Sequence, residues 1–337
     1  MSFNARKTLS ILALSILAMA AVFGAAAQKK TVVLSAASMF DTDHPFTQTY
    51  IKFEELVNKY QDEVKIELKY SLNKALGIES DYMRFMSQGE SVDLAIISPG
   101  HLAQRVPNIA IVDMPLLFRD LAHRNKVLDS DLFKGLEAEI VKRANIRPIG
   151  YAGGASRSMI SNYPIRNMQE LKGFRLRVQG APIWAKVFTA VGAVPSVIAY
   201  DEVYSAIQTN VIQGLENEKV GYAQMRFFEV AKYYIENEHS ITVRPLFISE
   251  KAWKQFSPKV QAAILKAGKE AGEYGSQFEI NMADRELKAL VDKGLTVHIK
   301  FPEADKAKFR ELATPELVKF VKDAGYYDLY VKIQEIK

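Results

Sequence analysis

Two neighbouring segments carry residues that could bind a small anion. The run FRLRV at 174–178 alternates apolar and basic residues, as expected of a strand with one buried face. Arg177 on such a strand loses its hydration unless its guanidinium meets an anion. That anion could be a protein carboxylate or a ligand carboxylate, which the guanidinium fork binds through two parallel hydrogen bonds. The strand position alone favours the protein carboxylate, and Arg157 in GASRSMISN presents the same choice. Glu216 and Asn217, an acid and an amide, follow a strand expected at 211–215.

The sequence lacks the usual groupings of catalytic or metal-binding residues. None of the five histidines belongs to a zinc-protease pair, and the absence of cysteine excludes thiolate ligands. Asp41, Asp43 and His44 lack the glycine and distal glutamate of a calcium loop, so we interpret them as a solvated turn. No nucleophile elbow, phosphate loop or dinucleotide motif occurs. Gly153 and Gly154 fit a hinge or turn better than they fit a phosphate loop. We therefore expect no enzyme activity, no metal and no cofactor.

The elements that would hold these residues alternate between strand and helix. Short apolar runs or strict alternation predict strands, and apolar residues at helical spacing predict helices. The expected strands cover 31–35, 64–70, 93–97, 146–151, 174–178, 211–215 and 241–248. The expected helices cover 44–60, 78–89, 131–144, 181–191 and 200–209. This alternation predicts an α/β fold with helices flanking the sheets, and a first lobe boundary at Gly153 and Gly154.

A long helical pattern follows this region. Ser257 and Pro258 are typical of a helix start, and apolar residues recur at helical spacing as far as Leu290. A single helix of that length would extend on the order of 50 Å, longer than one lobe requires. The pattern fits either a strut that bridges two lobes or two helices with a break near 272–275.

The N-terminal residues resemble an export signal. Arg6 and Lys7 precede an apolar run at 9–23, and small residues lead to an expected cleavage after about Ala27. An uncleaved anchor is the alternative. Removing the signal would lower the formal net charge from +5 to +3, and acids alternate with bases along the chain, which argues against nucleic-acid binding. Without cysteine there is no disulfide and no thiol to carry a lipid anchor, so we expect a protein that is not embedded in a membrane and diffuses in a periplasm. We also expect a monomer.

The order of several short motifs resembles one receptor family. The motifs are HPF at 44–46, Leu76-Gly77 with Glu79, the turn at 89–93, MPLLF at 114–118, Arg157 with Asn162, LKGFRLRV at 171–178, GAVPSVIAYDEVYSAIQTNVIQG at 192–214, and Glu216-Asn217. Together they resemble the extracytoplasmic solute receptors of tripartite ATP-independent periplasmic (TRAP) transporters, over nearly all of the chain after the signal. The resemblance implies a two-lobed periplasmic binding protein fold, with the ligand cleft between the lobes and a long helix bridging them. The implied first lobe comprises 28–154 and 243–282, and the second comprises 155–242 and 283–337.

The resemblance also implies roles for individual residues. The arginine matching Arg177 forms the salt bridge to the ligand carboxylate, and the one matching Arg157 makes a second or water-linked contact. Asn217 matches an asparagine that binds the same carboxylate or a neighbouring hydroxyl, with Glu216 beside it. Tyr200 matches an aromatic residue that lines the cleft. Glu79 and Ser98 lie on first-lobe segments that reach the ligand in relatives.

Departures from the common pattern concern the ligand. Many relatives have Pro-Asn where this chain has Gln179 and Gly180. Gln179, together with Trp184 and the phrase EVAKYY at 229–234, is more similar to receptors for uronates and related sugar acids. Trp184 fits equally a pocket floor or a core residue. Lys219 replaces an aromatic found in several of those relatives, which leaves room for a second acidic group on the ligand.

The resemblance thus implies a receptor that binds an organic acid, such as a sugar acid, and delivers it to the membrane subunits of a TRAP transporter. A receptor for a four-carbon dicarboxylate or a keto acid in the same system is one alternative. A periplasmic enzyme or a sensor module on the same scaffold is an alternative of another class.

Overall fold

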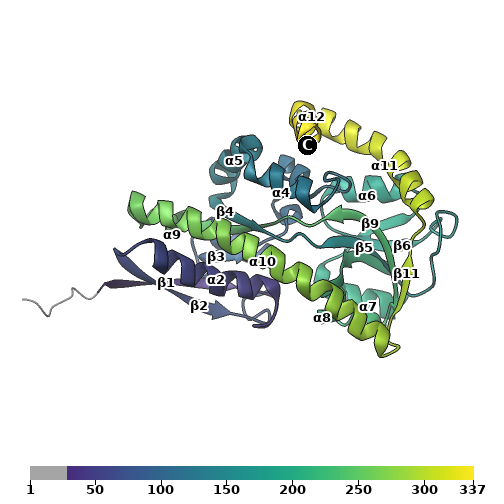
Figure 1. Cartoon of the computed structure of the whole chain (residues 1–337), viewed down its shortest axis with the longest axis horizontal. Helices are drawn as coiled ribbons and strands as arrows, with labels where there is room; N and C mark the ends of the chain where they lie inside the picture. The colour runs from purple at the N-terminus through teal and green to yellow at the C-terminus, as the bar shows by residue number, and fades with distance from the viewer. Residues whose placement is uncertain (1–28) are drawn as a thin grey trace, which may run out of the picture.

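The computed structural model describes residues 29–337, so the predicted signal at 1–27 lies outside the described residues. Two β-sheets lie side by side with helices packed around them, and one long helix runs along both (Figure 1). None of the helices between residues 29 and 337 combines the length and the apolar character needed to cross a bilayer.

The first sheet has five strands in the order β2-β1-β3-β10-β4. Its strands are β1 (Lys30–Ala37), β2 (Val64–Ser71), β3 (Leu94–Ile96), β4 (Ile146–Ala152) and β10 (Arg244–Ser249). β1 pairs in parallel with β2 and β3, whereas β10 enters from much later in the chain and pairs antiparallel to β3 and β4. The helical elements on this side are α2 (Pro45–Tyr60), α3 (Glu79–Gln88), η1 (Pro99–Leu102), η2 (Pro107–Asp113), α4 (Leu121–Asp129), η3 (Asp131–Phe133), α5 (Lys134–Ala144) and α9 (Glu250–Trp253).

Local sequence explains how α2 is joined to this sheet. His44 caps the helix by accepting a hydrogen bond from the Phe46 amide, and Pro45 occupies the first turn. Tyr50, buried on the inner face, donates to the carbonyl of Ala37 (2.9 Å) and accepts from the amide of Ile96 (2.7 Å). One side chain therefore links α2 to both β1 and the end of β3. His44 is buried, so the prediction of a solvated turn at 41–44 is wrong for this residue.

The second sheet has six strands in the order β11-β9-β5-β8-β6-β7. Its strands are β5 (Ser156–Ser161), β6 (Arg175–Val178), β7 (Val194–Val197), β8 (Gly214–Glu218), β9 (Tyr233–Ile241) and β11 (Val297–Lys300). β6 is parallel to β7 and β8, and β5 runs antiparallel between β8 and β9. The helical elements on this side are α6 (Pro182–Ala190), η4 (Tyr200–Glu202), α7 (Val203–Gln208), α8 (Lys219–Gln224), η5 (Phe227–Glu229), α11 (Glu303–Asp323) and α12 (Tyr327–Glu335).

Two strand predictions are wrong in detail. The expected strand at 241–248 spans a crossover, because β9 ends at Ile241 and β10 begins at Arg244 in the other sheet. The strand expected at 211–215 begins only at Gly214, so Glu216 and Asn217 lie within β8 and do not follow it. Both errors arose because an apolar run does not reveal where the chain changes its pairing partner.

The chain crosses between the sheets at two adjacent places, the β4–β5 and β9–β10 connections. Gly153 and Gly154 adopt φ angles of +87° and +116°, a conformation that side chains with a Cβ rarely adopt. Arg124 from α4 lies buried behind both connections. Its Nε donates to the carbonyl of Thr242 (3.0 Å) and its Nη2 donates to that of Ala152 (2.6 Å). A single side chain therefore holds the two crossovers together.

The long helical pattern forms one unbroken helix, α10 (Pro258–Asp292), of 35 residues. It packs against α2 and β4 at one end and against α8 at the other (Figure 1). The alternative of two helices with a break at 272–275 is therefore wrong. A Cβ on Gly272 would lie 2.6 Å from the Tyr151 carbonyl oxygen, and one on Gly275 would lie 1.9 Å from Thr49 Oγ1. These glycines permit close packing and do not mark a break.

The C-terminal segment contacts both halves of the molecule. α11 packs on α6 beside the second sheet, whereas α12 contacts η3 and, through the His123 ring and the Ile333 carbonyl, α4 (Figure 1). Tyr326 donates to Glu139 Oε2 (2.9 Å), and Gln334 Nε2 donates to the Leu117 carbonyl (2.8 Å). The proposed lobe limits remain a prediction, and residues 283–337 do not lie wholly with the second sheet.

Glu279, in the middle of α10, makes stability depend on pH. Its side chain is buried and Oε2 has no hydrogen-bond partner. Burial raises the pKa of Glu279 from 4.5 to about 7, with Glu218 adding to the rise and nearby arginines opposing it. Because the folded-state pKa is raised, the stabilising contribution is complete below pH 4.5 and is lost as the pH rises through 7. We expect Glu279→Gln to exceed the unaltered protein in unfolding free energy by about 3 kcal/mol at pH 8.

Urea unfolding at pH 4.5 and pH 8 checks this prediction. The difference between Glu279→Gln and the unaltered protein should nearly vanish at the lower pH. Glu273→Gln, on an exposed part of the same helix, is the control and should change stability little at either pH. An equal difference at both pH values for Glu279→Gln would contradict the assignment.

Candidate functional site

A cavity of about 270 Å³ opens between the two sheets. It lies at the carboxyl ends of the parallel strands β6 and β8, where α/β proteins commonly bind ligands. The lining residues come from both halves and are Met39, Phe40, Phe46, Ile78, Glu79, Ser80, Ser98, Gly100, His101, Arg157, Arg177, Gln179, Gly180, Val197, Ile198, Ala199, Tyr200, Asn217, Glu218 and Arg244. Of the predicted site residues, Glu79, Ser98, Arg157, Arg177, Gln179, Tyr200 and Asn217 line the cavity, whereas Glu216 and Trp184 do not.

Arg177 enters the cavity from the end of β6. Its side chain is 6% exposed, its Nε donates to the carbonyl of Ile198 (3.0 Å), and its guanidinium carbon lies 5.3 Å from the centre of the Tyr200 ring. Within the described residues no acidic side chain forms an ion pair with it. Burial lowers the pKa of Arg177, although Glu216 partly offsets this effect. The internal ion pair that its strand position alone favoured is absent, which leaves a buried cation facing the cavity.

Arg157, in contrast, is fully engaged by protein acids. Its Nε donates to Glu216 Oε2 (2.5 Å), its Nη1 to Glu218 Oε2 (2.7 Å) and its Nη2 to the Glu216 carbonyl (2.8 Å). Burial opposes its charge, but the two carboxylates raise the pKa of Arg157 above its ordinary value. The internal-pair interpretation therefore fits Arg157, which presents a positioned and largely neutralised guanidinium to the cavity.

Glu216 lies behind Arg157 rather than in the cavity wall. Adjacent residues on a strand point to opposite faces, so Glu216 turns towards Arg157 and Asn217 turns towards Tyr200. His239 Nε2 lies 3.5 Å from Glu216 Oε2, the same oxygen that accepts from Arg157 Nε. Burial alone would raise the pKa of Glu216, but Arg157 lowers it, so the acid stays ionised. Its contact is with Arg157, and the predicted ligand contact is not seen in the cavity lining.

Asn217 and Tyr200 form a hydrogen-bonded pair beside Arg177. Asn217 Nδ2 donates to the Tyr200 hydroxyl (2.7 Å), and burial raises the pKa of Tyr200, which keeps the phenol protonated. A Cβ on Gly221 would lie 2.5 Å from Asn217 Nδ2, so a glycine is needed there. Gln179 Nε2 is buried without a hydrogen-bond partner. Most buried amides in proteins have a hydrogen-bond partner, so this donor is available to a group in the cavity.

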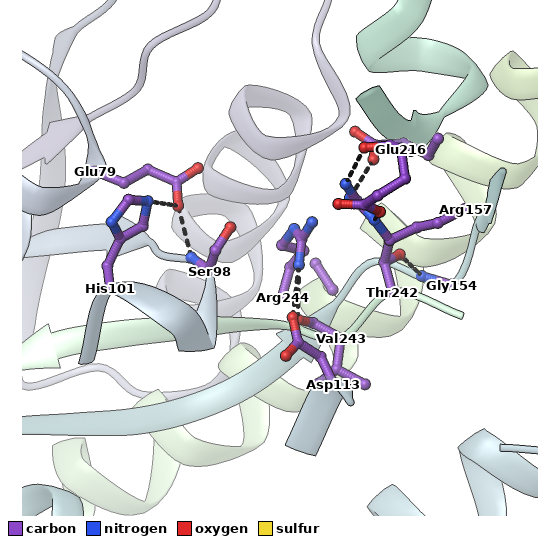
Figure 2. A network of polar contacts seen from close by, with 12 residues as sticks. Glu79, Ser98, His101, Asp113, Gly154, Arg157, Glu216, Thr242, Val243 and Arg244 are labelled. Carbon is purple, nitrogen blue, oxygen red and sulfur yellow. Dashed lines mark hydrogen bonds and ion pairs between the residues drawn. The ribbon is translucent and has the colours of Figure 1, made fainter. Parts of the chain in front are cut away.

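The first-lobe wall combines polar and apolar groups. Glu79 Oε2 accepts from the Ser98 amide (2.6 Å) and lies 3.6 Å from His101 Nε2 (Figure 2). Burial lowers the pKa of His101, although Glu79 opposes this shift. Ser98 thus positions Glu79 through its backbone. Phe40, stacked at 3.6 Å on the ring of His44, contributes to the apolar side of the cavity.

Sequence reasoning missed Arg244, which lines the cavity from the start of β10. Its Nη1 lies 3.3 Å from Asp113 Oδ2 (Figure 2). Burial raises the pKa of Asp113 to about 6, and the neighbouring Arg244 opposes the rise. The signal that drew attention to Arg177, an arginine within an apolar strand, was also present here in VRPLFIS at 243–249.

Two residues that were linked to the ligand lie elsewhere. Trp184 is fully buried in the core, with its ring near Arg157 and His239, and is not among the residues that line the cavity. Lys219 binds Asp284 Oδ1 (2.7 Å) and Glu236 Oε1 (3.1 Å) at the outer surface. It is not among the residues that line the cavity.

The described residues hold no group of three histidine or acidic side chains placed to bind a metal ion. The cavity wall contains Arg177, which has no acidic partner among the described residues, and Arg157 and Arg244, which pair with acids. It also contains amide, hydroxyl and carboxylate groups. This arrangement can bind an anion and neutral polar groups attached to it.

Comparisons with known proteins agree with this geometry. Residues 36–323 match the family described as bacterial extracellular solute-binding protein, family 7. A solute-binding protein of Sulfitobacter sp. strain NAS-14.1 is 45% identical over 306 residues, which is 90% of each chain. A solved TRAP periplasmic solute-binding protein from Sulfitobacter sp. NAS-14.1, with bound α-D-taluronate, has a TM-score of 0.85 at 42% identity and covers 90% of this chain and 97% of that one. Another solved TRAP periplasmic solute-binding protein, from Xanthobacter autotrophicus Py2 with bound β-D-galacturonate, has a TM-score of 0.81 at 28% identity. It covers 90% of this chain and 100% of that one.

The comparisons confirm the α/β fold with two lobes that the sequence motifs implied. The match spans both sheets, the cavity between them and most of the helices around them. The chain belongs to family 7 of the bacterial extracellular solute-binding proteins, the solute receptors of TRAP transporters.

Proposed function

We propose that this protein is a periplasmic receptor that closes around a sugar acid with one carboxylate, such as a hexuronate, and delivers it to the membrane subunits of a TRAP transporter. The observation that carries the proposal is Arg177, a buried cation without an acidic partner among the described residues, in the wall of the cavity between the sheets. The two solved relatives with bound taluronate and galacturonate support the choice of ligand class.

The carboxylate of the ligand would pair with Arg177. A buried guanidinium without a partner is costly, and each charge-assisted hydrogen bond to a carboxylate contributes about 1.5–3 kcal/mol. Asn217 and the Tyr200 hydroxyl lie next to this anchor and supply further polar contacts. Because the cavity walls come from both lobes, an anion bound to Arg177 favours the closed arrangement over one in which the cleft is open.

The remainder of the cavity suits a small polyhydroxylated molecule. A volume of about 270 Å³ is small for a ligand site, and its polar groups are distributed over both walls. Gln179 offers an unused amide donor, and Glu79 offers carboxylate oxygens that accept from hydroxyls. Phe40 and Met39 provide an apolar surface of the kind on which a sugar ring can lie.

We infer a receptor rather than an enzyme, because the matching family consists of extracellular solute-binding proteins. A monomer in the periplasm is part of the same proposal. Recovery of chemically unaltered sugar acid after prolonged incubation with the protein supports the receptor, and conversion of the acid to a product would contradict it.

A thermal-shift and calorimetry screen tests the ligand class. D-galacturonate, D-glucuronate and D-taluronate should raise the melting temperature, since a ligand that binds only the folded state stabilises it by mass action. D-galactose, which has the same ring as D-galacturonate without the carboxylate, is the matched control and should not. Stabilisation by the neutral sugar, without stabilisation by any acid, would overturn the proposal.

A further inference from the structure

Arg244 is the second buried arginine of the cavity whose donors are incompletely used. It is 6% exposed, and both of its hydrogen bonds within the described residues come from Nη1, to Asp113 Oδ2 and to the Val243 carbonyl, each at 3.3 Å. A guanidinium has five N–H donors, so Nε and Nη2 remain for another partner. Figure 2 shows this group between the Glu79, Ser98 and His101 cluster on one side and Arg157 with Glu216 on the other. Arg244 is also one of the residues that line the cavity.

Asp113 distinguishes Arg244 from Arg177 electrostatically. The carboxylate of Asp113 is 2% exposed and pairs with Arg244, so the two together carry little net charge. Arg157 pairs with two carboxylates, Glu216 and Glu218, so this cluster has no positive charge left for a ligand. Among the arginines that line the cavity, Arg177 alone has no acidic partner within the described residues. The site therefore offers one arginine, Arg177, as the partner of a ligand carboxylate.

A second carboxylate on the ligand would meet an unfavourable environment. Away from Arg177, the wall presents Glu79, itself an acid, and Arg244, whose charge Asp113 already balances. Donors without net charge suit hydroxyl and ring oxygens, whereas a carboxylate placed beside Glu79 loses hydration and is repelled. The same residues that accept a polyhydroxylated chain thus exclude a diacid.

We propose that Arg244, held and neutralised by Asp113, is a specificity-determining residue that donates to the hydroxyl oxygens of the ligand and makes the receptor select monocarboxylic over dicarboxylic sugar acids. This inference rests on the proposed function. It adds Arg244 to the residues that contact the ligand, and it adds the selection against a second carboxylate. It also disfavours a four-carbon dicarboxylate as the ligand, because such a molecule has two carboxylates and no hydroxyl chain.

Calorimetric titration with D-galacturonate and galactarate tests the proposal, since galactarate is the six-carbon acid with a carboxylate at both ends. The unaltered protein should bind D-galacturonate more tightly. Arg244→Met removes the donors and should weaken D-galacturonate binding about ten- to a hundredfold. Asp113→Asn leaves Arg244 with an unbalanced charge and should improve galactarate relative to D-galacturonate by about tenfold or more.

Two further variants keep the test decisive. Arg147→Met, an arginine of the same sheet that pairs with Glu250 outside the cavity, is the matched control and should leave both affinities unchanged. Arg244→Lys keeps the charge without the fork of donors, so it should weaken D-galacturonate while preserving the preference over galactarate, and it replaces Asp113→Asn if that variant does not fold.

Each outcome decides between the alternatives. Binding of D-galacturonate by Arg244→Met as tightly as by the unaltered protein overturns the role of Arg244. The ratio of the affinities for D-galacturonate and galactarate tests the selection against a second carboxylate. If this ratio is the same in Asp113→Asn as in the unaltered protein, or if the preference for D-galacturonate disappears in Arg244→Lys, that selection does not depend on the charge balance between Arg244 and Asp113. Absence of any sugar-acid binding to the unaltered protein would instead refute the proposed function on which this inference rests.

Discussion

Replacing Arg177 by methionine is expected to lower the affinity for D-galacturonate by at least about a hundredfold, because two charge-assisted hydrogen bonds of about 1.5–3 kcal/mol each are lost. The fold should survive, since Arg177 makes a single hydrogen bond within the described residues, to the Ile198 carbonyl, and methionine fills most of the space of its aliphatic stem. Removing a buried cation without an acidic partner should leave the stability of the ligand-free protein equal or slightly higher.

Calorimetric titration with D-galacturonate measures the affinity, and thermal unfolding without ligand measures the stability. Arg175→Met is the matched control, because Arg175 lies on the same strand but its guanidinium binds Asn210 at an exposed edge. This control should retain the full affinity. If Arg177→Met bound D-galacturonate within threefold of the unaltered protein, the carboxylate anchor would lie elsewhere.

Gly150→Val should destabilise the folded protein by about 3–5 kcal/mol, the largest stability effect that we expect from one substitution. A Cβ at Gly150 would lie 2.0 Å from the carbonyl oxygen of Gly268 and 2.4 Å from its carbonyl carbon. Both atoms are backbone, so β4 and α10 would have to separate and the contact between Gly150 and Gly268 would be lost. Because α10 spans both halves of the molecule, separation at this point disturbs more than one lobe.

Urea unfolding monitored by circular dichroism checks this expectation. Gly135→Ala is the control, because Gly135 lies in α5 and an added Cβ would meet nothing within 4 Å. Alanine is the better helix former, so this change should stabilise the protein by about 0.5–1 kcal/mol. A Gly150→Val variant as stable as the unaltered protein would show that β4 and α10 do not approach so closely.

The sequence predicted most of the local structure because the signals are local. Alternation at 174–178 correctly placed Arg177 on the face opposite Leu176, and Ser257 with Pro258 correctly marked the start of α10. The limits of a strand were less certain. The run at 241–248 contains the point where the chain leaves one sheet for the other, and this depends on which distant strands it pairs with.

The candidate site was only partly predictable for the same reason. The order of the motifs predicted Arg177, Asn217 and Tyr200 in one site, and all three line the cavity. The contacts of Glu216 and Lys219 were not evident from the sequence. An apolar helix face is compatible with either a core or a pocket, which is why Trp184 stayed undecided. Arg244 was overlooked although it shares the signal of Arg177, because no motif pointed to it.

The sequence by itself determined the α/β alternation, the strand that carries Arg177 and, through the order of its motifs, the receptor family. Only the tertiary structure decided which of the cavity arginines has no acidic partner. Arg157 pairs with Glu216 and Glu218, and Arg244 pairs with Asp113, whereas no acidic side chain in residues 29–337 pairs with Arg177. The partner of a buried charge is a residue far away in the chain, about 60 positions for Arg157 and 131 for Arg244, so no local pattern can reveal it.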